Sequence, residues 1–95
     1  MAVFIMLTKL TSNGVRTIKD NPGRVQEVNR EVEQLGVKVL NQWATLGEYD
    51  FVSVVEAPDD LTIANMSVRL GARGSVRFET LPLVPVDDLL GALEA

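Results

Sequence analysis

The sequence contains neither histidine nor cysteine among its 95 residues. The lack of cysteine excludes disulfides and thiolate zinc sites, and the lack of histidine removes the usual proton shuttle at neutral pH. Serine–histidine and cysteine–histidine catalytic pairs are excluded for the same reason. A metal site would have to use carboxylates and carbonyls alone, and no run such as Asp-x-Asp-x-Asp-Gly provides one. We therefore expect no metal and no cofactor.

Basic clusters and long apolar runs are also missing. The net charge is -4 and the Lys and Arg residues are scattered singly, whereas phosphate binding needs a concentrated basic patch, so we expect no nucleic-acid partner. The longest early apolar run, residues 2–7, is too short to span a membrane, and no charged leader precedes it. The sequence thus predicts a cytoplasmic protein with no membrane partner. Its length predicts a single domain, residues 1–95, with one modest core.

The hydrophobic periodicity predicts strands and helices in the order β-α-β-β-α-β. The expected strands are residues 3–8, 37–46, 51–57 and 75–83. A first helix, with apolar residues spaced three and four apart, follows the expected N-cap Asn21 and Pro22 and ends at Gly36. Residues 11–20 are expected to be irregular or a short helical turn. This order is that of the ferredoxin-like α+β fold, a four-stranded antiparallel sheet with two helices on one face.

The second helix is expected after Pro58, with Asp59 or Asp60 as its cap and Gly71 or Gly74 at its end. Beyond the core of residues 3–83, Asp87 is the expected cap of a tail helix over residues 86–94, which docks on its own subunit or on a neighbour. Right-handed crossovers place the first and third strands at the centre of the sheet.

These two central strands are apolar on both faces. Val3, Ile5 and Leu7 alternate with Phe4 and Met6 in the first, and the third repeats the pattern. Two helices can cover only one face, and the other face of such a sheet is normally polar. Leaving an apolar patch of this kind in water forgoes several kcal/mol at about 25 cal/mol per Å2. We therefore expect self-association through the second face, as in a homodimer of dimeric α/β-barrel type or a higher oligomer.

The run LGEYDFV at residues 46–52, followed by EAPDD at residues 56–60, resembles the segment for which the GYD-domain family is named. The similarity extends to GVRTIKDNP at residues 14–22 and GSVRFETL at residues 74–81, in the family's order. The resemblance implies a small bacterial or archaeal protein, ferredoxin-like and related to dimeric α/β barrels. The family has no generally established activity, so the resemblance implies nothing about chemistry.

Tyr49 and Asp50 are the first candidates for a ligand site. In a structural role, Gly47 allows the turn, Asp50 bonds backbone amides, and Tyr49 covers the end of the core. In a functional role, the phenol and the carboxylate form a polar handle for a ligand at the mouth of the barrel. Hydrogen bonding is favoured over proton transfer, because the ordinary pKa of tyrosine is about 10.

Four further residues complete the candidate site. Asn41 and Trp43 lie two apart on the second strand, either as a solvated edge amide and a core or interface aromatic or as a cavity wall. Arg77, with Glu56 or Glu79, either forms part of a protective ladder of charges or holds an anionic ligand. The sequence does not fix the hairpin register and so leaves the face of Glu56 open.

Two functions remain open at this point. The first is a homo-oligomeric module that binds a small apolar or anionic molecule, or that acts as an accessory module. The alternative is a cofactor-independent enzyme, monooxygenase-like or isomerase-like, that uses a cavity near Tyr49 together with Asp50, Trp43 and Asn41. A structural protein without any ligand is the third alternative.

Overall fold

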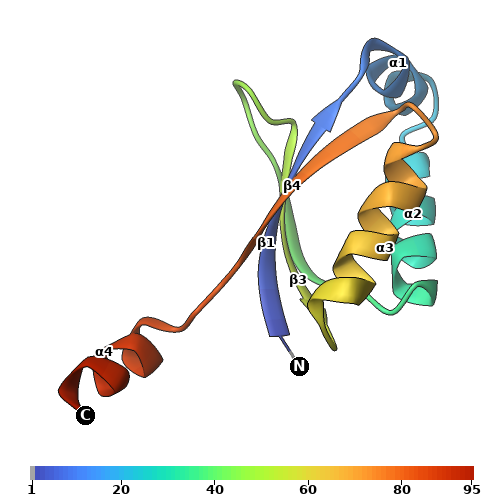
Figure 1. The fold of residues 1–95 in the computed structure, drawn as a ribbon. Helices are drawn as coiled ribbons and strands as arrows, with labels where there is room; N and C mark the ends of the chain where they lie inside the picture. Colours follow the sequence, from blue (N-terminus) through green and yellow to red (C-terminus); the bar gives the residue numbers. More distant parts are fainter. Residues whose placement is uncertain (1) are drawn as a thin grey trace.

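The computed structural model describes residues 2–95 and contains one four-stranded antiparallel sheet with helices packed on one face (Figure 1). The strands are β1 (Ala2–Leu10), β2 (Lys38–Ala44), β3 (Phe51–Ala57) and β4 (Val76–Pro82). The helices are α1 (Ser12–Asp20), α2 (Arg24–Gln34), α3 (Asp60–Gly71) and α4 (Val86–Glu94). None of the helices described is long and apolar enough to cross a membrane.

The strand order is β2-β3-β1-β4, and every neighbouring pair is antiparallel. This order confirms the ferredoxin-like prediction, with the first and third strands at the centre. A bulge at Leu40 interrupts the register between Val39 and Asn41. Such a bulge bends an edge strand and re-aims its side chains.

The hydrophobic core lies between the sheet and the helices. Alternation along β1 and β3 turns Phe4, Met6 and Val55 toward the helices, and α2 and α3 each supply an apolar stripe to meet them. The buried apolar side chains of the core are those of Phe4, Met6, Val32, Val37, Val55, Ala57, Ile63, Met66 and Leu70.

Residues 12–20 form the helix α1. The sequence left open an irregular segment or a short helical turn over residues 11–20, and the irregular alternative was wrong. The Thr11 hydroxyl caps the helix by accepting from the Gly14 amide at 3.2 Å, and it donates to the Gly74 carbonyl at 2.8 Å. Gly14 is buried against Ser75, where a side chain would collide with the Ser75 carbonyl. A tertiary contact thus stabilises a helix whose composition, rich in Ser, Asn and Gly, is typical of a loop.

The predicted start of the next helix was also wrong. Asn21 ends α1 instead of capping α2, and the Arg24 amide donates to the Asn21 carbonyl in the turn between them. The Gly36 stop is confirmed, because its φ of 94° lies in the region that favours glycine. Asp59 is confirmed as the cap of α3, since its carboxylate accepts from the Thr62 amide at 2.8 Å.

The C-terminal helix α4 stands apart from the body at the end of an extended segment (Figure 1). The tail helix over residues 86–94 is confirmed, but its N-cap is Pro85 and not Asp87. All of its residues are exposed, including Leu89, Leu90 and Leu93. The helix therefore does not dock on its own subunit.

Candidate functional site

The face of the sheet turned away from α1, α2 and α3 is mixed in character, and we call it the open face. Strand alternation and the cross-strand register assign its members. They are Val3, Ile5, Leu7, Lys9, Lys38, Asn41, Trp43, Val52, Val54, Glu56, Arg77, Glu79 and Leu81. Its centre is apolar, as predicted from the alternation in the two central strands, and charged residues lie toward the ends of the strands.

The open face consists of successive cross-strand rows. One row runs across the four strands from β2 to β4 and consists of Trp43, Val52, Leu7 and Glu79. The next row begins on β2 with Asn41. Trp43 is 54% exposed, so the expectation of a buried aromatic holds only if another molecule covers it.

Glu56 lies at the far end of the open face, directly between Lys38 and Val3. The register thereby settles which face Glu56 occupies, and it places this residue two rows away from Trp43. Oppositely charged side chains directly across two strands stabilise their pairing, which accounts for Glu56 within an apolar strand.

Tyr49 and Arg77, by contrast, lie together. With Lys9, Glu48 and Glu79 they line a surface hollow of about 380 Å3 at the end of the sheet. Lys9 and Arg77 are directly opposite in the pairing of β1 with β4, and two like charges so placed repel each other.

The Tyr49 hydroxyl donates a hydrogen bond to the Glu79 carboxylate. This bond holds the phenolic proton and raises the pKa of Tyr49 to about 12. Tyr49 therefore stays protonated throughout the physiological pH range and acts as a hydrogen-bond donor. The predicted preference for hydrogen bonding over proton transfer agrees with this geometry.

The Asp50 side chain does not line that hollow and instead binds the backbone at the end of β1. Its carboxylate accepts from the Leu10 amide at 2.8 Å, while the Asp50 amide donates to the Thr8 carbonyl at 2.8 Å. The hairpin between β2 and β3 is thus fastened to the end of β1. The sequence suggested bonds within the turn, but the partner lies forty residues away along the chain.

The candidate residues therefore separate into three groups. Tyr49 and Arg77 share the hollow, Asp50 joins two strands, and the remaining three lie elsewhere on the open face. These three are Asn41, Trp43 and Glu56.

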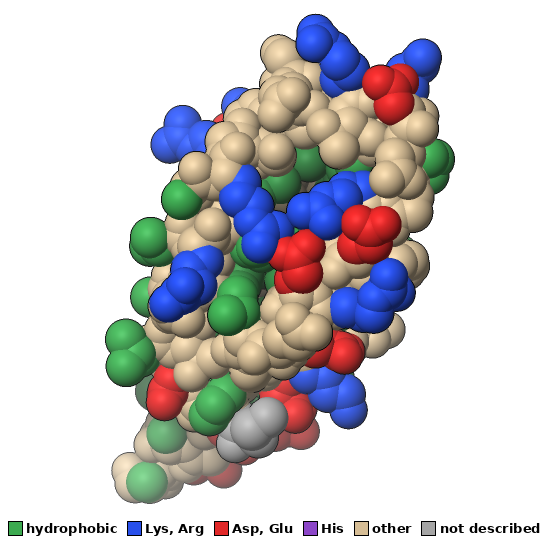
Figure 2. Space-filling view, turned by 90° about the vertical axis from the view of Figure 1, so that its right-hand side faces the viewer, with side chains coloured by type: hydrophobic (Ala, Val, Ile, Leu, Met, Phe, Trp, Pro, Cys, Tyr) green, Lys and Arg blue, Asp and Glu red, His purple; other side chains and the backbone are tan. Residues whose placement is uncertain are grey.

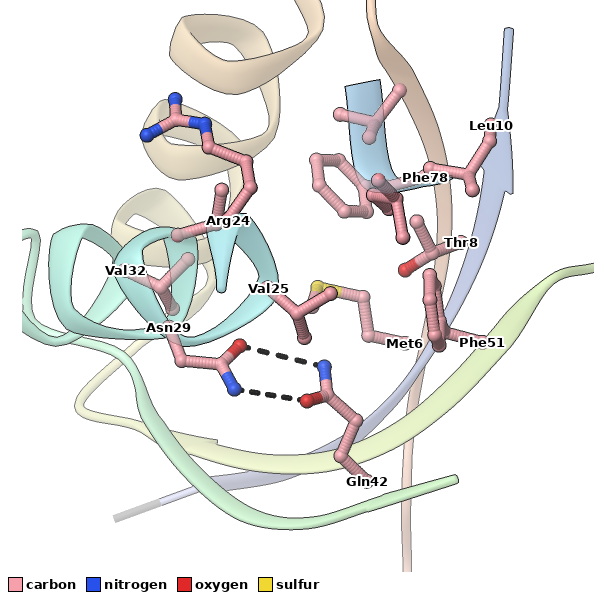
Figure 3. Close-up of a pocket in the computed structure, with 13 residues that line it drawn as sticks. Met6, Thr8, Leu10, Arg24, Val25, Asn29, Val32, Gln42, Phe51 and Phe78 are labelled. Carbon is pink, nitrogen blue, oxygen red and sulfur yellow. Dashed lines mark hydrogen bonds between the residues drawn. The ribbon is translucent and has the colours of Figure 1, made fainter. Parts of the chain in front are cut away.

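A small cavity between α2 and the sheet, shown in Figure 3, was not predicted from the sequence. It has a volume of about 70 Å3, and its walls are mostly apolar. Asn29 of α2 and Gln42 of β2 meet at one edge of it and exchange two hydrogen bonds, and Gln42 also donates to the Ser53 hydroxyl at 3.2 Å. One usable signal was Asn29, a polar residue within the apolar stripe of its helix.

Opposite charges bridge the helices on the far side of this cavity. Arg24 binds Glu27 and Glu31 at 3.0 Å each, and Glu31 also binds Arg73 after α3. The hydrogen bond from Arg73 lowers the pKa of Glu31, and the bond to Glu27 raises the pKa of Arg24. Figure 2 shows basic and acidic side chains side by side on this face, around a hollow in which hydrophobic side chains are visible.

Comparison with known proteins identifies a relative over the whole chain and a similar fold among solved structures. The chain is 48% identical over 95 residues to the glutamine synthetase and cystathionine beta-lyase binding protein of Thermus thermophilus, covering 99% of this chain and all of the relative. The crystal structure of TTHA0845, also from Thermus thermophilus, has the same fold, with a TM-score of 0.57 and 23% identity over 90% of this chain and 95% of that one. The sequence model of the GYD domain matches residues 4–93. This protein therefore belongs to the GYD-domain family, as its sequence predicted.

Proposed function

We propose that this chain is an accessory module that binds a metabolic enzyme. The observation that carries the proposal is the relative named for binding glutamine synthetase and cystathionine beta-lyase, which matches this chain over its full length at 48% identity. Such a likeness extends to the surface as well as the core, and binding surfaces are where the function of a small domain resides. Glutamine synthetase and cystathionine beta-lyase are accordingly the first partners to test.

The module acts as a homodimer in this proposal, with two copies joined through their open faces. Val52 and Val54 at the centre of that face are only half-buried, and Trp43 on β2 and Leu81 on β4 are exposed on the same face. An apolar patch bordered by charges is typical of a protein–protein interface. Two sheets packed about 10 Å apart would remove this patch from water.

The test of enzyme binding uses purified partners from the same organism. The immobilised full-length chain is titrated with glutamine synthetase and with cystathionine beta-lyase, and binding is measured by surface plasmon resonance. We expect a saturable complex with at least one of them, and a Kd in the micromolar range or tighter corresponds to about -8 kcal/mol or better. Bovine serum albumin at the same concentration is the control. If neither enzyme bound saturably at concentrations up to about 100 µM, the free energy of binding would be weaker than about -5.5 kcal/mol. This result would refute the proposal.

The hollow beside Tyr49 supports a second candidate function, the binding of a small polar molecule that carries an anionic group. The supporting observation is the pair Lys9 and Arg77, two cations directly opposite each other at the edge of a hollow of about 380 Å3. An anion between them would relieve their repulsion, while the Tyr49 hydroxyl and Glu79 offer a donor and an acceptor.

Native mass spectrometry of the purified protein tests this second function. We expect a bound small molecule that is lost in Arg77→Gln and retained in Arg16→Gln, a matched change at an exposed arginine of α1. A molecule retained equally by both variants would place the ligand elsewhere. A protein that carries no small molecule and binds none from a panel of carboxylates would exclude this function.

A further inference from the structure

We propose that α4 is an exchanged arm, which each copy of the chain packs against the body of a second copy. The inference rests on the homodimer proposed above and adds a segment of the chain to its interface. It concerns residues 83–94, whose large apolar side chains are exposed within one copy.

The apolar side chains of α4 lie on one stripe. Val86, Leu89, Leu90 and Leu93 recur at helical spacing, and each is between 49% and 74% exposed. An amphipathic helix of this length is marginal in water on its own, because most helical stability in proteins comes from packing of the apolar face. The helix therefore needs a partner surface that its own body does not supply.

The connecting segment keeps α4 away from its own body. Pro82 and Pro85 have fixed φ angles, and the residue before each proline is confined to extended conformations. Extended conformations are accordingly favoured at Leu81 and Val84. These preferences favour the extended course of the segment seen in Figure 1, which holds α4 away from its own sheet.

The excess surface of one copy matches what a dimer needs. Its accessible surface is 6377 Å2, against about 5400 Å2 for a compact monomer of this mass. Its radius of gyration is 14.7 Å, against about 12 Å for a compact chain of this length. The difference of about 1000 Å2 is close to the 800 Å2 or so that each partner buries in a standard interface.

A second copy is the occupant that these observations favour. The arm continues directly from β4, where Leu81 lies on the open face and the Leu83 amide donates to the Val3 carbonyl at 2.9 Å. A copy seated on the open face therefore comes within reach of α4. Because a two-fold axis repeats every contact, one dimer would cover both apolar stripes and both open faces at once.

Amide hydrogen exchange of α4 tests directly whether the arm packs on a second copy. The full-length chain is diluted through the concentration at which sedimentation velocity shows the dimer dissociating, and exchange of the peptide spanning residues 86–94 is followed by mass spectrometry. We expect protection of this peptide to rise with the fraction of dimer, and to vanish in the monomer.

Two matched variants accompany the dilution series. Leu90→Glu places a charge within the apolar stripe, whereas Gly91→Glu places the same charge on the opposite side of α4, where nothing lies within 4 Å. We expect Leu90→Glu to weaken dimerisation about tenfold or more, and Gly91→Glu to change it less than about twofold. Because α4 is exposed in one copy, both variants leave the body folded.

Four other outcomes would overturn the inference. An unprotected α4 in a stable dimer would leave the open-face dimer standing without the arm. Protection in the dilute monomer would mean that α4 folds back, and protection only after addition of glutamine synthetase would mean that the enzyme is the occupant. A chain that stays monomeric at every concentration would refute both the dimer and the arm, while the enzyme-binding proposal would stand on its own titration.

Discussion

Replacing Asp50 by alanine distinguishes a structural from a ligand-binding role at the most conspicuous segment of the sequence. The Asp50 carboxylate accepts from the Leu10 amide at 2.8 Å, in a half-buried position at the junction of the hairpin and β1. Asp50→Ala removes the acceptor and leaves the backbone N–H of Leu10 without a partner.

The expected cost follows from the type of bond. A hydrogen bond to a charged group contributes about 1.5–3 kcal/mol, and partial exposure favours the lower half of this range. We therefore expect a loss of about 2 kcal/mol in the free energy of unfolding. In a domain of this length each kcal/mol shifts Tm by about 4–8 °C, which predicts a decrease of about 10 °C.

Thermal denaturation followed by circular dichroism measures the shift, and two variants serve as controls. Asp50→Asn retains an oxygen that can accept from the Leu10 amide, and we expect it to recover more than half of the loss. Glu48→Ala removes an exposed carboxylate from the same loop, with little change expected. If Asp50→Ala melted within about 1 °C of Glu48→Ala, the carboxylate would not hold the hairpin and a role in ligand binding would regain support.

Three further predictions concern stability. Gly14→Ala should lower the free energy of unfolding by about 2 kcal/mol despite the better helix propensity of alanine, because the new methyl group collides with the Ser75 carbonyl. The control Gly91→Ala should not destabilise the protein, since nothing lies within 4 Å of that position. Equal Tm values for the two variants would contradict the close contact between Gly14 and Ser75. Tyr49→Phe should leave Tm nearly unchanged, since the hydrogen bond from its hydroxyl to Glu79 is exposed, and a large decrease would assign that hydroxyl to the hairpin. Arg73 lowers the pKa of Glu31 in the folded state. The ionised Glu31 carboxylate therefore stabilises the fold above the ordinary carboxyl pKa, and this stabilisation is lost as the pH falls through the lowered value. The variant Glu31→Gln should thus lose less stability than the parent between about pH 5 and pH 3, and parallel curves would contradict this.

The sequence predicted the sheet because its evidence was local and repeated. Alternation in β1 and β3 identified both apolar faces, and the right-handed crossover rule placed these strands at the centre. Asp59 was likewise predictable as a cap, since its partner is the amide of Thr62, three residues further along the chain.

The features that the sequence did not predict depend on distant partners. The helix α1 forms because Thr11 and Gly14 meet the loop at Gly74 and Ser75, a contact across about sixty residues. Asp50 took a partner on β1 in place of one in its own turn for the same reason. Composition and short-range rules describe the free segment, whereas the observed conformation is selected by the tertiary contact.

The two proposed interactions constrain each other. A surface buried between two copies is closed to an enzyme, so a dimer joined through its open faces leaves the helical face of α1, α2 and α3 for enzyme binding (Figure 2). If the enzyme binds there, its affinity for the module should not change with the fraction of dimer. If the enzyme binds the open face, dimerisation competes with it, and the apparent affinity falls as the module is concentrated beyond the Kd of its own dimer. Titrations of the enzyme at module concentrations about tenfold below and above that Kd separate these cases, since competition would change the apparent affinity severalfold.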